Sequence, residues 1–449
     1  MNPEFSQYTV PEVIKKYSMA RNSLAHETGS TLSFKSIDVA RRFDAMMGNI
    51  AGYVFANPIP FNRLPSQIAV VTNPVVAAEI LTAQEFDSLD VDTPVQKTSD
   101  FFKGKFISTT IQRDQWLRER SSLKTEYSPT HVQKIAIEAH ESVRDGILEM
   151  AEQNTLPEDW IKIVTLRTMF DLLSSKRVPL AEATRAMQSH TSFLKHSIVP
   201  LLSGLYPQSF GTVVKGTVLR PYEELISYLI SEVKSSNDQV MFKHILSNLG
   251  AGEDDITIEN VVRTLMGCFN GTPTYIQSIL FALAQHPEYQ EAVHDGDTEL
   301  LKRIMYEVGR MTPPVPIATR RVKKDITFNE VTLKENDILV IGIYAFGGEK
   351  FVEDAHTFNP ERPGLDKMAH IQGGTAGIFS YGPRGCVAKH FAFMLAQQAT
   401  SAIVEQYTIC CQNNPYPILG GVGLRFSEPL KFMLTDRSTG KKIEAVTHN

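Results

Sequence analysis

The sequence predicts a mainly α-helical protein with a small β-rich part. Apolar residues recur at helical spacing through most of residues 116–249. Residues 51–60 and 67–72 are rich in Val, Ile, Tyr and Phe and are bounded by Pro, Asn or Gly, which is typical of short strands. Residues 325–347 alternate and also predict strands. We expect a single domain over residues 1–449, with a β-rich part at approximately 45–75 plus 320–345 and a helical part at approximately 112–311 and 388–407.

The order of elements follows from local signals. Asn73 is followed by Pro and an apolar stretch, which predicts a helix with an asparagine cap. The helical periods that follow are interrupted at residues 154–158, 203–207 and 235–238, where turn-forming residues gather. The remaining predictions are a long helical segment at 257–284, helices at 300–311 and 391–407, and a hairpin tip at 415–424.

Composition excludes several classes of protein. With 449 residues and 42% hydrophobic content the chain can bury a large core, and its net charge of −5 argues against nucleic acid as a partner. No apolar run reaches about 18 residues, so no transmembrane helix is expected. The start resembles no signal sequence. These features predict a cytoplasmic chain, although a native membrane anchor that had been trimmed away would leave the same sequence.

The cysteines follow no disulfide framework. The sequence has four of them, and two stand side by side as Cys410 and Cys411. Adjacent cysteines seldom pair with each other, so we expect reduced thiols and an intracellular setting.

One cysteine lies in a loop suited to metal binding. Residues 379–390 read Phe-Ser-Tyr-Gly-Pro-Arg-Gly-Cys-Val-Ala-Lys-His, just ahead of a predicted helix. The positive end of the helix dipole and nearby Arg384 would both favour a charged sulfur on Cys386. Glycines on either side would let a large flat cofactor approach the backbone. Haem iron is one of the few sites that need a single sulfur, and the alternative is a structural cysteine beside a turn.

The same loop resembles the haem-binding signature of the cytochrome P450 family. The resemblance rests on the pattern Phe379-x-x-Gly-x-Arg384-x-Cys386. It implies the cytochrome P450 fold and haem b as cofactor. Cys386 would be the axial ligand of the iron, and the haem would lie between the long central helix and the cysteine loop.

Two further motifs match the family in the expected order. Glu307-x-x-Arg310 is similar to the family's Glu-x-x-Arg pair, and residues 358–362, Phe-Asn-Pro-Glu-Arg, resemble its Phe-x-Pro-x-Arg segment. The resemblance implies a buried structural triad of Glu307, Arg310 and Arg362 that locks the cysteine loop. Without the family, the first pair would be an exposed helical ion pair.

Three residues match the family's contacts to the haem carboxylates. Trp116 and Arg120 resemble a Trp-x-x-x-Arg motif, in which both side chains share one helical face. Arg320 matches the arginine aimed at the other carboxylate. The alternative for each arginine is a solvated surface charge.

The long central helix departs from the family pattern. Where relatives carry an acid followed by Thr, this chain has Asn270 and Gly271, and Thr272 would replace the alcohol if the register slips by one residue. An amide can donate a hydrogen bond but supplies no proton at neutral pH. Pro273 predicts a kink near the carbonyl of Phe269.

The resemblance implies a hydrophobic pocket, or, for the aromatic residues of the loop at 86–111, a small satellite core instead. The candidate pocket residues are Phe101, Phe102, Phe106, Phe269, Val315, Ile317 and Leu419.

Three functions remain open. The first is an oxidative enzyme that carries out monooxygenation, coupling or ring formation on a hydrophobic small molecule, using O2 and electrons from a ferredoxin or flavin reductase. The reductase would contact Arg118, Lys124 and Lys389. The alternative for each of these residues is a solvated surface charge. The second is a reductase-independent isomerase or dehydratase of a lipid hydroperoxide or endoperoxide, with Asn270 steering the peroxide. The third is a haem-binding sensor or carrier.

Overall fold

The structure is a computed structural model. The chain forms two compact units. Unit 1 is Met1–Thr93, Lys302–Cys386 and Pro415–Glu428, and unit 2 is Pro94–Leu301, Val387–Asn414 and Pro429–Asn449. The prediction of a single domain therefore stays a prediction. The described residues are 5–28, 32–33, 35–47, 52–56, 67–83, 87–91, 113–152, 155–175, 177–196, 220–235, 241–249, 258–259, 261–262, 264, 268–328, 331–365, 378–419 and 423–446.

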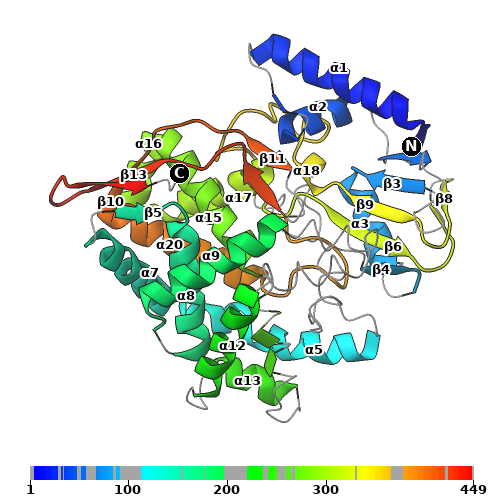
Figure 1. Cartoon of the computed structure of the whole chain (residues 1–449). Helices are drawn as coiled ribbons and strands as arrows, with labels where there is room; N and C mark the ends of the chain where they lie inside the picture. Colours follow the sequence, from blue (N-terminus) through cyan, green and yellow to red (C-terminus); the bar gives the residue numbers. More distant parts are fainter. Residues whose placement is uncertain are drawn as a thin grey trace. The chain divides into compact units, whose positions relative to one another are not determined.

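Unit 1 is built on a six-stranded sheet in the order β1-β2-β3-β9-β6-β4, counted over the described residues (Figure 1). Its strands are β1 (Phe5–Tyr8), β2 (Gly52–Ala56), β3 (Gln67–Val71), β4 (Leu89–Val91), β6 (Ala318–Val322) and β9 (Ile338–Ile341). β2 and β3 confirm the two predicted N-terminal strands, and β9 pairs in parallel with β3 in the register Val70↔Val340. Two hairpins complete the strands: β7 (Ile326–Phe328) with β8 (Val331–Leu333), and β11 (Pro417–Leu419) with β12 (Leu424–Phe426).

Helices accompany this sheet. The Asn73 side chain accepts hydrogen bonds from the backbone N–H of Val75 (2.9 Å) and of Val76 (3.3 Å), so the predicted asparagine cap is confirmed. Ala77 and Leu81 of the capped helix belong to an apolar core that also includes Leu339 and Phe346. Among its described residues, unit 1 has the helices α1 (Val10–Thr28), α2 (Ile37–Met46), α3 (Pro74–Ala83), α18 (Ile343–Phe346) and most of α17 (Thr298–Met311).

Unit 2 is mainly helical. α8 (Trp160–Ser174) carries mostly apolar residues of its own around its circumference, and it is buried along almost its whole length. It contacts both α7 (Ala136–Ala151) and α15 (Cys268–Gln285). α15 and α7 also contact α20 (Lys389–Gln406). The described part of unit 2 also contains α5 (Arg113–Glu126), α6 (Pro129–Lys134), α9 (Leu180–His196), α12 (Arg220–Lys234), α13 (Met241–Asn248) and α16 (Pro287–His294).

A second sheet in unit 2 was not predicted. Its order is β10-β13-β14-β5, formed by β10 (Tyr407–Cys411), β13 (Phe432–Asp436), β14 (Lys442–Val446) and β5 (Thr155–Pro157). β5 falls on the predicted break at 154–158 and pairs in parallel with β14. Pro157 is tolerated there because β5 is an edge strand. None of the described helices combines the length and apolar character that crossing a membrane requires.

Candidate functional site

The cysteine loop of unit 1 is closed by two backbone hydrogen bonds. Cys386 N–H donates to the carbonyl of Phe379 (2.8 Å), and Gly385 N–H donates to that of Gly382 (3.0 Å). Ser380 and Gly382 have φ values of 62° and 70°, so two left-handed residues turn the chain. Cys386 is an exposed residue.

The backbone of this loop lies against the core of unit 1. Tyr381 is only 4% exposed, and its ring lies 5.8 Å from the ring of Phe346, centroid to centroid. A Cβ added to Gly382 would lie 2.6 Å from the carbonyl oxygen of Leu81, so only glycine fits there. The loop therefore combines a fixed backbone with an exposed cysteine, which suits a preorganised metal ligand.

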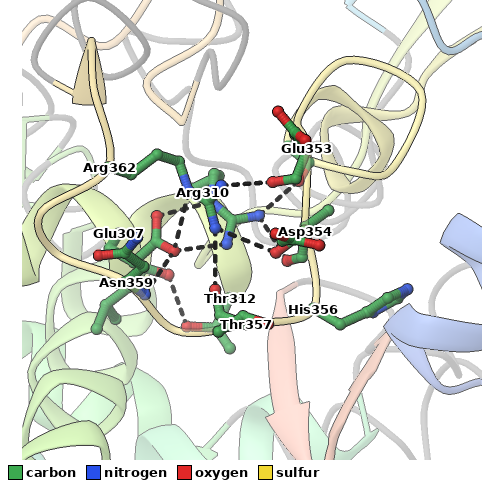
Figure 2. Close-up of polar contacts among 12 residues, drawn as sticks. Glu307, Arg310, Thr312, Glu353, Asp354, His356, Thr357, Asn359 and Arg362 are labelled. Atoms are coloured by element: carbon green, nitrogen blue, oxygen red, sulfur yellow. Dashed lines mark hydrogen bonds and ion pairs between the residues drawn. The ribbon is translucent and has the colours of Figure 1, made fainter.

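The three residues predicted as a triad lie together in unit 1 (Figure 2). Glu307 and Arg310 are fully buried and form a two-pronged ion pair, with both donor–acceptor distances at 2.7 Å. Arg362 Nε lies 3.5 Å from Glu307 Oε1, which also accepts the backbone N–H of Asn359 at 3.1 Å. Glu307 is thus surrounded by donors.

Both arginines also hold backbone carbonyls. Arg310 Nη1 donates to the carbonyls of Gly347 (2.7 Å) and Ala355 (2.9 Å). Arg362 Nη2 donates to those of Asp354 and Thr357, each at 3.1 Å. The irregular segment from 347 to 362 is therefore anchored by side chains instead of by a sheet or helix ladder. This arrangement suits a structural role.

The candidate carboxylate contacts lie on regular elements. In unit 2, the Arg120 guanidinium carbon lies 5.2 Å from the centroid of the Trp116 ring, so the structure brings this predicted pair together on α5. In unit 1, Arg320 lies on β6 and is 5% exposed, with Nη1 donating to the carbonyl of Thr319 at 2.9 Å. The contacts of these three residues to haem stay predictions.

α15 carries the residues predicted for catalysis. Pro273 lies inside the helix, which runs as one element from Cys268 to Gln285 and contains no acidic residue. Thr272 is 5% exposed. Gly271 is half-buried, and a Cβ added to it would meet no atom of the described residues within 4 Å. The side chains of Phe269 and Asn270 lie outside the described residues.

The predicted pocket residues are only partly described. Ile317 and Leu419 pack against one apolar cluster of unit 1, whereas Val315 is 40% exposed. Phe101, Phe102 and Phe106 lie outside the described residues. A substrate contact for any of them stays a prediction.

The candidate site residues are divided between the units. Unit 1 holds the cysteine loop with Phe379, Arg384 and Cys386, together with Arg320 and the triad. Unit 2 holds Trp116, Arg120 and α15. The position of haem between the central helix and the loop therefore stays a prediction.

Sequence reasoning missed two contributors to the triad. The N–H of Asn359 completes the shell of Glu307, although Asn359 lies inside a recognised motif. Gly347 leaves room for Arg310, because an added Cβ would lie 2.5 Å from Arg310 Cγ. The adjacent glycines at 347 and 348 were the available signal for close backbone approach.

Comparison with known proteins identifies the family. The cytochrome P450 family description matches residues 60–432, so this chain belongs to the cytochrome P450 family. Cytochrome P450 716A67 of Medicago truncatula is 29% identical over 205 residues, which make up 40% of this chain and 38% of that protein. Cytochrome P450 3A25 of Mus musculus is 25% identical over 174 residues, 34% of each chain. The matched stretches thus span well under half of these relatives' own lengths.

Solved structures show the same fold. A six-coordinated cytochrome P450 from Thermus thermophilus superimposes with a TM-score of 0.66 at 17% identity, covering 88% of this chain and 96% of that one. CYP175A1, from another strain of the same organism, gives the same TM-score and identity, covering 95% and 98%. The predicted fold class is therefore confirmed: mainly α with a small β-rich part, in the cytochrome P450 fold.

The family also defines the cofactor. Its members bind haem b through a cysteine thiolate, so haem b is the cofactor of this chain. The described residues fit it, because Cys386 is an exposed cysteine on a loop whose backbone is fixed by hydrogen bonds and by the fit of Gly382 against Leu81.

Proposed function

We propose that this protein is a haem-thiolate oxidoreductase acting on a hydrophobic small molecule with O2 and electrons from a redox partner. The observation that carries the proposal is that Cys386 is an exposed cysteine on a fixed loop in the same unit as the buried triad. Cys386 would ligate the iron, while Trp116, Arg120 and Arg320 would hold the carboxylates. Haem, when bound, supplies the oxygen-activating redox chemistry.

The protein's own groups have limited means of moving protons on α15. Without an acid on this helix, the candidate donor is the hydroxyl of Thr272, and Asn270 can orient a polar substrate group without giving up a proton. Among the described residues, no atom lies within 4 Å of a Cβ added to Gly271, which supports room for a substrate group at that turn. Oxidation would therefore depend on a proton that the substrate or water brings, either directly or through the hydroxyl of Thr272.

A second function is favoured by the composition of α15. An amide in place of the acid suits an enzyme that accepts a lipid hydroperoxide or endoperoxide and isomerises or dehydrates it without a reductase. Such a reaction needs no proton relay for O2 cleavage. Asn270 would then steer the peroxide oxygen, and Asn270→Asp is expected to weaken the reaction, because a carboxylate repels the oxygen that an amide N–H attracts.

Two parallel assays distinguish these functions. The purified full-length chain is mixed with a fatty-acid hydroperoxide alone and, separately, with NAD(P)H, a surrogate ferredoxin or flavin reductase and a panel of hydrophobic substrates. Product that requires both reductant and O2 supports the oxidoreductase. Fast consumption of hydroperoxide without reductant would instead establish the second function.

The redox partner is proposed to contact a basic part of unit 2. Arg118 and Lys124 are exposed on α5, and Lys389 begins α20. Long-range attraction between these cations and an acidic partner would weaken with salt. Replacing Arg118 and Lys124 by Gln should therefore lower the rate of reduction at low ionic strength and flatten its salt dependence.

A further inference from the structure

Arg41 is a buried cation with no place in the site described so far. It lies on α2, is 3% exposed, and reaches two separate segments of unit 1. Its Nε donates to the carbonyl of Tyr344 at 2.8 Å, and its Nη2 donates to the carbonyl of Arg310 at 2.6 Å. Burial lowers the pKa of Arg41 to about 10, so the guanidinium is still charged at neutral pH.

The carbonyl of Arg310 needs this donor. In a continuing helix it would accept the N–H four residues on, but that residue is Pro314, which has none. α17 ends at Met311, shortly before two prolines. Arg41 thus completes the last turn of the helix that carries Glu307 and Arg310.

The second acceptor of Arg41, the carbonyl of Tyr344, belongs to α18. This helix has four residues, and Figure 1 shows it beside α2, which it contacts. The following glycines are tightly enclosed: a Cβ on Gly347 would lie 2.7 Å from the Arg310 carbonyl oxygen, and one on Gly348 would lie 3.3 Å from Arg41 Cγ. A second buried contact joins α2 to the next turn, where Lys350 Nζ lies 3.7 Å from Asp44 Oδ1. α18 is therefore held by α2 and by the end of α17, in addition to the apolar core that buries Ile343 and Phe346 and the hydrogen bond from Tyr344 N–H to the carbonyl of Pro316 (2.9 Å).

The cysteine loop rests on this short helix. Phe346 is fully buried at the end of α18, and its ring meets that of Tyr381 at 5.8 Å. Among the described aromatic residues of the loop, only Tyr381 belongs to the apolar core of unit 1. A displacement of α18 would thus be passed directly to the backbone that presents Cys386.

We infer that Arg41 is a positioning residue for the cysteine loop, acting through α18 and the contact between Phe346 and Tyr381. The consequence for haem binding rests on the proposed haem-thiolate function. The positioning itself is a property of the protein alone and can be measured without the cofactor.

Hydrogen exchange of the apo full-length chain tests the inference. The amides of Gly385 and Cys386 are protected by the hydrogen bonds that close the loop. In Arg41→Met we expect their exchange to rise by roughly tenfold, together with that of residues 343–348, as for a local opening made easier. Arg41→Lys keeps the charge and one set of donors, and should restore part of the protection.

A second variant checks the route. Phe346→Leu removes the ring contact but leaves Arg41 in place, so exchange should rise in the loop and stay unchanged in residues 343–345. Arg167→Met, which removes an equally buried arginine of unit 2, controls for general loss of stability and should leave the loop amides protected. Loop exchange in Arg41→Met equal to that in wild type or in Arg167→Met would overturn the inference.

The haem-bound protein gives an independent reading. If the proposed function is correct, Arg41→Met should show a smaller fraction of the thiolate-type Soret band in its reduced, CO-bound form. If wild-type protein lacks that band, the proposed function fails, while the exchange experiment still decides the role of Arg41.

Discussion

At the scale of single residues, the cysteine loop depends on backbone conformations that few side chains allow. Gly382 is left-handed at φ 70°. A Cβ added to it would also overlap with the carbonyl oxygen of Leu81, at 2.6 Å. Gly364 is left-handed too, at φ 76°, but no atom of the described residues lies within 4 Å of its added Cβ. Comparing substitutions at Gly382 and Gly364 therefore separates the free-energy cost of a left-handed backbone from the cost of a steric overlap.

Gly382→Ala should destabilise the protein more than Gly364→Ala. Both substitutions cost about 1–2 kcal/mol for a left-handed non-glycine residue. Only Gly382→Ala adds the overlap with the backbone of Leu81, of about 1–3 kcal/mol. Urea unfolding of both variants measures the difference, and equal losses would show that the loop does not lie against α3 as described.

Asp436 gives a prediction about pH. Its Oδ1 accepts from the side chain of Ser438 at 2.7 Å and from the backbone of Thr439 at 2.7 Å, among other donors, and these hydrogen bonds lower the pKa of the carboxyl from 3.8 to about 2. Its contribution to stability is therefore present above pH 3.8 and lost as the pH falls through about 2. Solvent exposure keeps the effect small. The amide resonances of Ser438 and Thr439 should titrate with a midpoint near 2, and a midpoint at 3.8 would rule out the bonded turn.

At the scale of elements, α17 organises the irregular segment that follows α18. Glu307 and Arg310 are completely buried, and a buried ion pair is tolerable only when its hydrogen bonds are made. Here both oxygens of Glu307 are occupied, and Arg310 carries two carbonyls in addition. On the same helix, before Glu307, Arg303 forms an ion pair with Glu361 at 2.9 Å, but these side chains are 39% and 61% exposed.

Glu307→Gln should be far more costly than Glu361→Gln. The first leaves buried guanidiniums without a counter-charge, at about 3–5 kcal/mol. The second breaks an exposed pair worth about 0–1 kcal/mol. Denaturant unfolding of the two variants provides the comparison. A Glu307→Gln protein as stable as Glu361→Gln would show that the triad is not a structural lock.

At the scale of the whole molecule, local patterns predicted more than distant pairings. The fold class, strands β2 and β3, the Asn73 cap and the C-terminal hairpin follow from short stretches of sequence, and the structure has them. β5 falls in the segment 154–158, which was predicted as a break because turn-forming residues gather there. Its strand partner is β14, at the other end of the chain, and no local signal encodes such a pairing.

The candidate site shows the same division. Glu307, Arg310 and Arg362 were found because the motifs are local, and the structure brings them together. Arg41 was missed, since an arginine in an amphipathic helix is usually solvated and only the fold reveals its two carbonyl acceptors. Asn359 contributes its backbone N–H, which every residue except proline carries, so its identity gives no signal.

The central claim is that Cys386 is the thiolate ligand of haem, and one measurement tests it directly. Full-length wild type, Cys386→His and the control Cys410→His are loaded with haem, reduced and exposed to CO. Cys410 is an exposed cysteine on β10, so its replacement should leave the spectrum unchanged. We predict the red-shifted, thiolate-type Soret band in wild type and Cys410→His and its loss in Cys386→His. A red-shifted band that persists in Cys386→His would contradict the assignment.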